Sequence, residues 1–240
     1  MSKLVIKLTL FFILININVF SSENRGFFQE IMKDPNSLKG KVTKAFEKYF
    51  KSPDKLKIKF YPTKKKSLMR GYFDRIDVTF QNAQVKVLQI ENASIQFFGL
   101  KINLLKLYKS GQLRIKDLKE AKFRIKISEK ALNDAIFRKK LPLKNPRLKI
   151  GNGVLAFKAH FRTLFIKSLV DTKGRLLVKE KSKVFFYPDR LKLNHLPIPG
   201  FVKKVISNKI NPIINLDDFD FIKEISEIDL SDGYIELINK

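Results

Sequence analysis

The chain has 240 residues, no cysteine and a formal net charge of +26. The lack of cysteine excludes a disulfide framework, a thiolate metal site and a cysteine nucleophile. A hydrophobic content of 44% predicts a globular protein with a sizeable core rather than a disordered chain.

Lysine supplies 39 of the 49 basic residues. Proteins that read nucleic acid rely more on arginine, whose planar guanidinium pairs bidentately with phosphate and guanine, so we expect no nucleic-acid partner. A lysine-rich composition is also what an AT-rich coding sequence produces without selection for binding. The charge is therefore consistent both with this neutral origin and with attraction to an anionic surface.

The first segment, residues 1–21, has the pattern of a secretory signal peptide. Lys3 and Lys7 form a basic start, a mostly apolar run covers residues 8–20, and small residues precede a cut before Ser22. The run is shorter than the roughly 20 residues that span a membrane, although an uncleaved anchor is an alternative. We therefore expect an exported protein that is periplasmic or associated with the cell envelope.

Residues 22–36 form a polar leader, and we expect a single domain over residues 37–240. An amphipathic helix is predicted from Ser37. Its apolar stripe consists of Leu38, Val42, Ala45, Phe46 and Tyr49. This helix either packs on a sheet or rests on a membrane. Residues 55–61 alternate and predict a strand, and residues 64–66 predict an exposed lysine loop.

The longest pattern runs from Gly71 to Asn133 and alternates between apolar and polar residues. Strict alternation predicts β-strands with one buried and one exposed face. The phase slips at several places, the first at residues 81–82, and such slips predict bulges or tight turns that curl the sheet. The pattern ends in a short helix that Ser128 caps.

A second set of alternating segments follows between residues 148 and 193. A further helix is expected around residues 201–210, and a closing hairpin over residues 225–237. Groups of strands separated by helices predict an α+β fold rather than a doubly wound parallel sheet. We expect a strongly curved, mainly antiparallel sheet wrapped around a few helices.

The sequence contains no motif typical of catalysis. There is no Gly-x-Ser-x-Gly elbow, no phosphate-binding glycine loop and no His-Glu-x-x-His helix. His160 and His195 are isolated, and the acidic run over residues 217–220 lacks EF-hand spacing. We therefore expect a binding protein that is not an enzyme and has no cofactor and no metal.

The apolar face of the predicted sheet is rich in phenylalanine. It forms either an ordinary core or an apolar cleft for acyl chains. The side chains expected to contact acyl chains are Phe60, Phe73, Phe80, Phe97, Phe123, Leu132, Ile136 and Phe157. Burial of one methylene contributes roughly 0.8 kcal/mol, so ten acyl carbons would contribute roughly 8 kcal/mol before ordering costs.

Several short motifs carry a family resemblance. They are Gly71-Tyr72-Phe73-Asp74-Arg75-Ile76, Ile90-Glu91-Asn92-Ala93-Ser94-Ile95, Ser110-Gly111-Gln112-Leu113-Arg114-Ile115 and Ile127-Ser128-Glu129-Lys130-Ala131-Leu132-Asn133. In this order they resemble the LmeA-like phospholipid-binding family, over residues 37–240 and most strongly over residues 70–133. The resemblance implies an exported bacterial envelope protein that holds a phospholipid in an apolar groove, with an architecture similar to tubular lipid-binding domains.

The leading hypothesis is an exported envelope protein that binds anionic phospholipid and contacts the membrane surface. It would carry lipid or support the assembly of envelope glycolipids. The cations expected at the headgroup are Lys64, Lys65, Lys66, Arg70, Arg138, Lys139 and Lys140. The alternative is a basic, non-catalytic module with a filled core that binds an anionic wall polymer or a protein partner.

Overall fold

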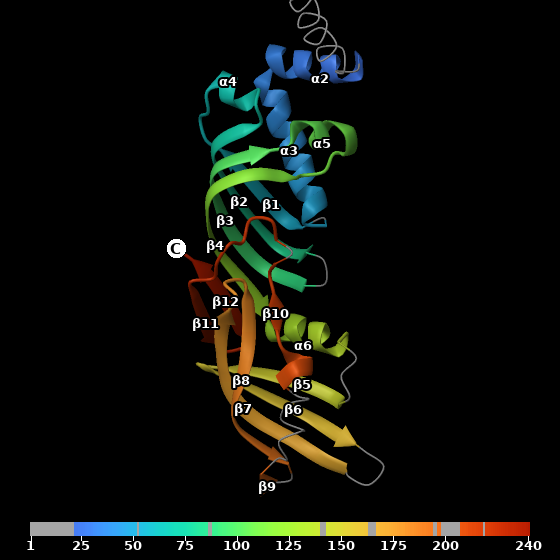
Figure 1. Ribbon diagram of the computed structural model, residues 1–240, viewed down its shortest axis with the longest axis vertical. Helices are drawn as coiled ribbons and strands as arrows, with labels where there is room; N and C mark the ends of the chain where they lie inside the picture. Colours follow the sequence, from blue (N-terminus) through green and yellow to red (C-terminus); the bar gives the residue numbers. More distant parts are fainter. Residues whose placement is uncertain are drawn as a thin grey trace, which may run out of the picture.

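A computed structural model describes most of the chain, as an elongated molecule built around two curved sheets (Figure 1). The described residues are 22–51, 53–85, 88–139, 143–162, 167–193, 196–197, 207–217 and 219–240. The predicted signal peptide lies outside these ranges. Of the helix expected around residues 201–210, only residues 207–210 are described, and they are helical.

The first sheet, called sheet A, has six strands, and every pairing between them is antiparallel. Their order across the sheet is β1-β2-β3-β4-β12-β11. Their bounds are β1 (Asp54–Phe60), β2 (Tyr72–Val85), β3 (Leu88–Ile102), β4 (Ile115–Ser128), β11 (Glu227–Ser231) and β12 (Tyr234–Asn239). The long alternating pattern therefore forms β2 to β4, and the closing hairpin joins them through β4.

Two residues with positive φ produce phase slips inside these long strands. Asn82 in β2 has φ 50°, and Gly99 in β3 has φ 62°. On either side of Gly99, Phe97 and Leu100 are both buried although they are three residues apart. Between β2 and β3 these residues leave the strand register unbroken. The predicted bulges appear in the neighbouring pairings, where the register shifts between Asp54 and Lys57 against β2 and between Lys101 and Ile102 against β4.

Among the described residues, two helices precede sheet A, namely α2 (Ser22–Lys33) and α3 (Pro35–Tyr49). The predicted stripe of α3 is confirmed, because Leu38, Val42, Ala45 and Phe46 are buried. The helix packs on the buried face of sheet A, where the ring of Phe46 lies 5.8 Å from that of Phe97. The segment expected to be a polar leader folds into α2, which buries Phe27 and Ile31.

Two short helices are not predicted by the sequence, α4 (Lys65–Leu68) and α5 (Leu104–Ser110). Asn103 caps α5, and its side chain accepts a hydrogen bond from the N–H of Lys106 at 3.1 Å. Gly111 ends the helix in the left-handed conformation, with φ 60°. The apolar alternation of β3 continues into the first turn of α5 and conceals the change from strand to helix.

The second sheet, called sheet B, is also antiparallel and is strongly curled (Figure 1). Its order is β10-β8-β7-β6-β5, with β9 paired to β8. Its strands are β5 (Lys144–Gly151), β6 (Val154–Arg162), β7 (Lys167–Lys179), β8 (Lys183–Leu193), β9 (Leu196–Pro197) and β10 (Ile214–Asn215). Two curved antiparallel sheets with helices on their buried faces confirm the predicted α+β class.

Helix α6 (Glu129–Phe137) connects the two sheets. The Asn133 side chain donates to the Leu148 carbonyl at 2.9 Å and accepts from the Leu148 N–H at 2.7 Å. The carboxylate of Glu129 accepts from the N–H of Ile150 at 2.8 Å. These polar contacts fix β5, the edge of sheet B, against the helix that leaves sheet A.

Candidate functional site

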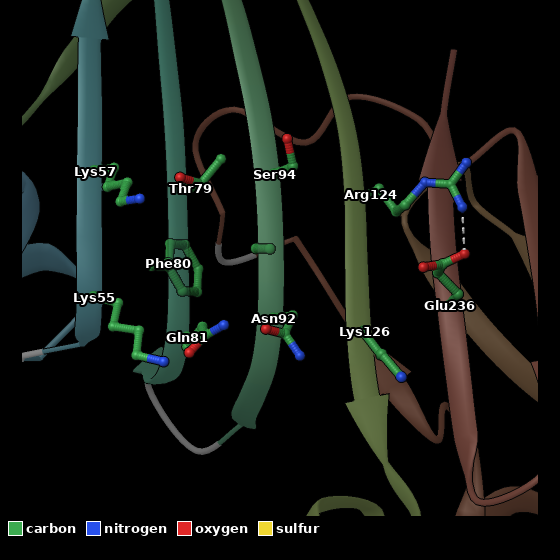
Figure 2. Close-up of a pocket in the computed structure, with 11 residues that line it drawn as sticks. Lys55, Lys57, Thr79, Phe80, Gln81, Asn92, Ser94, Arg124, Lys126 and Glu236 are labelled. Atoms are coloured by element: carbon green, nitrogen blue, oxygen red, sulfur yellow. Dashed lines mark hydrogen bonds and ion pairs between the residues drawn. The ribbon is translucent and has the colours of Figure 1, made fainter.

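The exposed face of sheet A carries a hollow of about 370 Å³, called the basic hollow (Figure 2). Its lining residues are Lys55, Lys57, Thr79, Phe80, Gln81, Asn92, Ala93, Ser94, Arg124, Lys126 and Glu236. Side chains alternate along a strand, so the polar members of this set point away from the core. Phe80 and Ala93 are buried and form the floor.

Strand register arranges the polar side chains in two rows across the sheet. The first row, from β1 to β4, is Lys57, Thr79, Ser94 and Arg124. The second row, from β2 to β12, is Gln81, Asn92, Lys126 and Glu236. Lys55 of β1 lies beside the second row (Figure 2). Neutral hydroxyl and amide groups therefore lie in the middle, with cations on both sides.

The two basic sides differ in how their charges are held. Arg124 forms an ion pair with Glu236, with 2.6 Å between Nη1 and Oε2. The Lys126 ammonium lies 3.6 Å from the centre of the Tyr234 ring. Lys55 and Lys57 take part in none of the ion pairs found among the described residues. The hollow thus has an excess of positive charge, because Glu236 is its single carboxylate.

A second hollow, of about 260 Å³, lies beside α3 and is called the helix hollow. Its walls are Ala45, Lys48, Tyr49, Gln112 and Leu113. Its apolar part borders the core, since the Tyr49 ring lies 5.2 Å from the ring of Phe50 and 6.2 Å from that of Phe221. The Lys48 ammonium donates to the carbonyl of Ser110 at 3.3 Å and places a cation at the rim. Apolar walls with one cation suit an amphipathic ligand.

The family model described as LmeA-like phospholipid-binding matches residues 38–238. The chain belongs to this family. No curated protein and no solved structure matches the chain. The match covers both sheets and α3, so the LmeA-like domain takes in the two hollows as well as the junction between the sheets.

Seven of the eight side chains predicted to contact acyl chains are buried in the apolar core of this LmeA-like domain, and Phe60 is partly buried and packs against that core. Five of them lie on the strands of sheet A, namely Phe60, Phe73, Phe80, Phe97 and Phe123. The other three lie on α6 and β6, namely Leu132, Ile136 and Phe157. Protein rings already contact several of them, since Phe80 lies 4.3 Å from Phe50 and Phe73 lies 5.8 Å from Phe60 between ring centres.

The cations predicted at a headgroup lie in two separate places. The first group is exposed around α4, at one end of the molecule (Figure 1), and consists of Lys64, Lys65, Lys66 and Arg70. The second group follows α6 and consists of Arg138 and Lys139, while Lys140 lies outside the described residues. The structure therefore does not bring the predicted cations together.

Lys139 has a structural role that the sequence does not reveal. Its ammonium donates to the carbonyl of Ile210 at 2.6 Å and also to the carbonyl of Pro212. The side chain as a whole is exposed, but loss of water around the amino group lowers the pKa of Lys139. It ties the end of α6 to the segment that leads into β10.

The remaining sequence candidates form no chemical site among the described residues. His160 is exposed on β6, and His195 lies outside the described residues. Asp217 forms an ion pair with Lys183 at 3.1 Å, and hydrogen bonds from Ser182 and Lys183 lower the pKa of Asp217. No group of three potential metal ligands and no helix able to cross a membrane is found in the part of the chain that the structure describes.

The sequence predicts neither the basic hollow nor the helix hollow. The lysines of β1 are visible in the sequence as the exposed side of an alternating strand. Arg124 and Lys126 have the same pattern in β4, about seventy residues away. Only the pairing of β1 through β4 brings the two sets to one surface, and alternation alone does not predict that order.

Proposed function

We propose that this protein is an exported envelope protein that binds anionic phospholipid without catalysing a reaction. The observation that carries this proposal is the match of the phospholipid-binding family model to residues 38–238. The basic composition supports a preference for anionic lipid, because a positive surface attracts negatively charged headgroups. In the envelope, such a protein would carry lipid or support glycolipid assembly.

The acyl chains would enter at the helix hollow and extend between α3 and sheet A. This route leads from Ala45 and Leu113 towards the aromatic residues of the buried face, among them Phe97. The hollow accommodates only part of a chain at its present volume of about 260 Å³, so full entry requires α3 to move away from the sheet. Lys48 would then contact the phosphate at the rim.

The exposed lysines around α4 would contact the membrane during lipid exchange. Lys64, Lys65 and Lys66 protrude together at one end of the molecule, and none of them takes part in an ion pair found among the described residues. Each lysine near an anionic bilayer contributes about 1 kcal/mol to association. The resulting orientation would present the α3 end of the molecule to the lipid surface.

Uptake of a fluorescent-chain phosphatidylglycerol from donor vesicles tests this proposal. We expect the protein to take up phosphatidylglycerol more readily than phosphatidylcholine. Leu113→Trp fills the helix hollow and should reduce uptake, whereas Leu105→Trp adds the same bulk on α5 at a side chain that is 42% exposed and should leave uptake unchanged. Failure of the wild-type protein to take up either lipid would overturn the proposal.

A further inference from the structure

The basic hollow faces away from the surface proposed for acyl chains. Its polar lining projects from the exposed side of sheet A, whereas α3 covers the opposite side through Phe46 and Phe97. The floor residues Phe80 and Ala93 are buried, so the sheet separates the hollow from the core. A lipid with its chains under α3 therefore cannot also place its headgroup in the basic hollow, which needs a different ligand.

The spacing of the cations limits what this ligand can be. Lys57 lies on β1 and Arg124 on β4, three strand spacings apart in one row, which corresponds to roughly 14 Å between backbones. A single small anion that contacts the lysines of β1 would be reached from β4 only by a fully extended Arg124 side chain. The two sides together suit a ligand with more than one anionic group along its length.

The side chains in the middle of the hollow indicate that the ligand carries hydroxyl groups between its anionic groups. Thr79, Gln81, Asn92 and Ser94 provide hydroxyl and amide groups that both donate and accept hydrogen bonds. A ligand made only of phosphate offers acceptors and would leave the carbonyl oxygens of the two amides without donors. A saccharide or polyol supplies donors and acceptors alike and therefore matches the centre better.

The shape of the site argues against a flat bilayer as its occupant. The two apolar residues of the lining, Phe80 and Ala93, are buried, at 2% and 6% accessible. No apolar side chain of the lining therefore projects far enough to insert among acyl chains. The polar centre of the hollow lies between the flanking cations (Figure 2). A chain-like ligand can enter such a depression, whereas the headgroup layer of a membrane would meet only its rim.

We propose that the basic hollow binds an anionic saccharide or polyol segment that carries at least two phosphate or carboxylate groups. Lys55 and Lys57 would hold one anionic group, and Arg124 would hold the other. In the free protein Glu236 forms an ion pair with Arg124, so an anionic group of the ligand must displace the Glu236 carboxylate. This site is separate from the proposed phospholipid site and provides a second function, attachment to an anionic envelope glycan.

Isothermal titration with trigalacturonate tests the proposal, with neutral maltotriose and inorganic tripolyphosphate as comparison ligands. We expect trigalacturonate to bind in a salt-sensitive manner and maltotriose not to bind. Lys55→Ala combined with Lys57→Ala should weaken trigalacturonate binding by at least about threefold, as expected for exposed charge pairs. Lys101→Ala combined with Lys116→Ala removes the same charge from exposed positions of sheet A outside the hollow and should have no effect.

Two further variants test the roles of individual groups. Glu236→Gln should strengthen trigalacturonate binding, because it frees Arg124. Thr79→Val combined with Ser94→Ala should weaken trigalacturonate binding more than tripolyphosphate binding, because the hydroxyls can only donate to phosphate but both donate to and accept from a saccharide. If the Lys55/Lys57 and Lys101/Lys116 variants bind trigalacturonate with equal affinity, the proposed site is wrong. If the Thr79/Ser94 change weakens trigalacturonate and tripolyphosphate binding equally, the assignment of a saccharide is wrong.

Binding to vesicles of phosphatidylglycerol and phosphatidylcholine tests whether the anionic ligand of the basic hollow is a membrane headgroup rather than a glycan. Loss of vesicle binding in the Lys55/Lys57 variant, without any trigalacturonate binding by the wild type, would assign the hollow to a membrane and overturn the proposal. Lipid extracted from the same purified variants separates the two functions. Changes in the basic hollow should leave extracted phospholipid at the wild-type level, so failure of one function does not imply failure of the other.

Discussion

Phe97 of β3 and Phe221 meet edge to face, with ring centres 5.3 Å apart and planes at 86°. Phe97 belongs to the first half of the chain, whereas Phe221 lies between β10 and β11. The segment that returns from sheet B therefore closes on the buried face of sheet A, beside α3. Phe221 also contacts Phe219 at 5.6 Å and Tyr49 at 6.2 Å, so it joins the helix to the C-terminal segment.

Removal of the Phe221 ring should destabilise the whole protein. Truncation of a buried phenylalanine to alanine typically costs about 3–5 kcal/mol, because apolar contacts are lost and a cavity remains. We expect Phe221→Ala to lower the free energy of unfolding in urea by this amount. Phe137→Ala is the control, since Phe137 is 74% exposed and its loss should change stability by less than about 0.5 kcal/mol. Similar effects of both variants would contradict this packing.

Gly99→Ala should be more harmful than Gly111→Ala, although the two glycines have nearly the same backbone conformation. Their φ angles are 62° and 60°, and the left-handed conformation costs a side-chain-bearing residue roughly 1–2 kcal/mol. A Cβ at Gly99 would also lie 2.9 Å from the Cβ of Lys119, whereas Gly111 has open space around it. The excess loss of stability of Gly99→Ala in urea unfolding should be about 1 kcal/mol or more. Equal losses would show that β3 tolerates the contact.

Stability at low pH should depend on Asp77. Burial alone would raise the pKa of Asp77. Hydrogen bonds from Arg75 at 2.8 Å and Tyr61 at 2.9 Å lower the pKa by more than burial raises it, so it lies below its ordinary value. A lowered folded-state pKa stabilises the protein above the unfolded pKa of about 3.9, and this contribution is lost as pH falls through the folded-state value.

The difference in unfolding free energy between wild type and Asp77→Asn isolates this contribution. We expect the wild type to be more stable at pH 6 and the difference to shrink as the pH falls below about 4. Tyr61→Phe removes one of the hydrogen bonds and should show a smaller difference in the same direction. A difference that grows on acidification would contradict the assignment.

Lys139→Ala should weaken the anchoring of the segment before β10. The variant leaves the carbonyls of Ile210 and Pro212 without their ammonium donor, and loss of such a partner costs about 1–3 kcal/mol where the carbonyl is buried. Lys130→Ala, on the exposed side of α6, is the matched control and should be nearly neutral. Faster amide hydrogen exchange around residues 210–214 in Lys139→Ala, at unchanged lipid content, would separate this structural role from headgroup binding.

The fold class and the central strands could be predicted from the sequence because they depend on local alternation. The stripe of α3 and the three strands β2 to β4 follow directly from apolar spacing. Helix α5 could not be predicted in this way, because Leu104 continues the alternation of β3 while the cap at Asn103 turns the chain. The burial of Phe27 in α2 depends on contact with Tyr108 of α5, at 4.8 Å between rings, which no local pattern reveals.

The candidate sites were harder to predict because they depend on the pairing of distant segments. Runs of lysine such as residues 64–66 are conspicuous in the sequence, but they lie around α4, which is far from α6 and the cations that follow it (Figure 1). The cations of the basic hollow alternate with apolar residues in two strands and form a surface only through register. The helix hollow combines Lys48 of α3 with the connection between α5 and β4, and the sequence did not predict α5.

Native mass spectrometry of gently purified protein, followed by organic extraction of any bound mass, tests phospholipid binding most directly. We expect one phospholipid per chain, with an anionic headgroup enriched over the composition of the host membrane. Filling of the helix hollow by Leu113→Trp should lower that occupancy. A bare mass that persists after incubation with phosphatidylglycerol vesicles would contradict the account and would leave the basic hollow as the principal binding site of the protein.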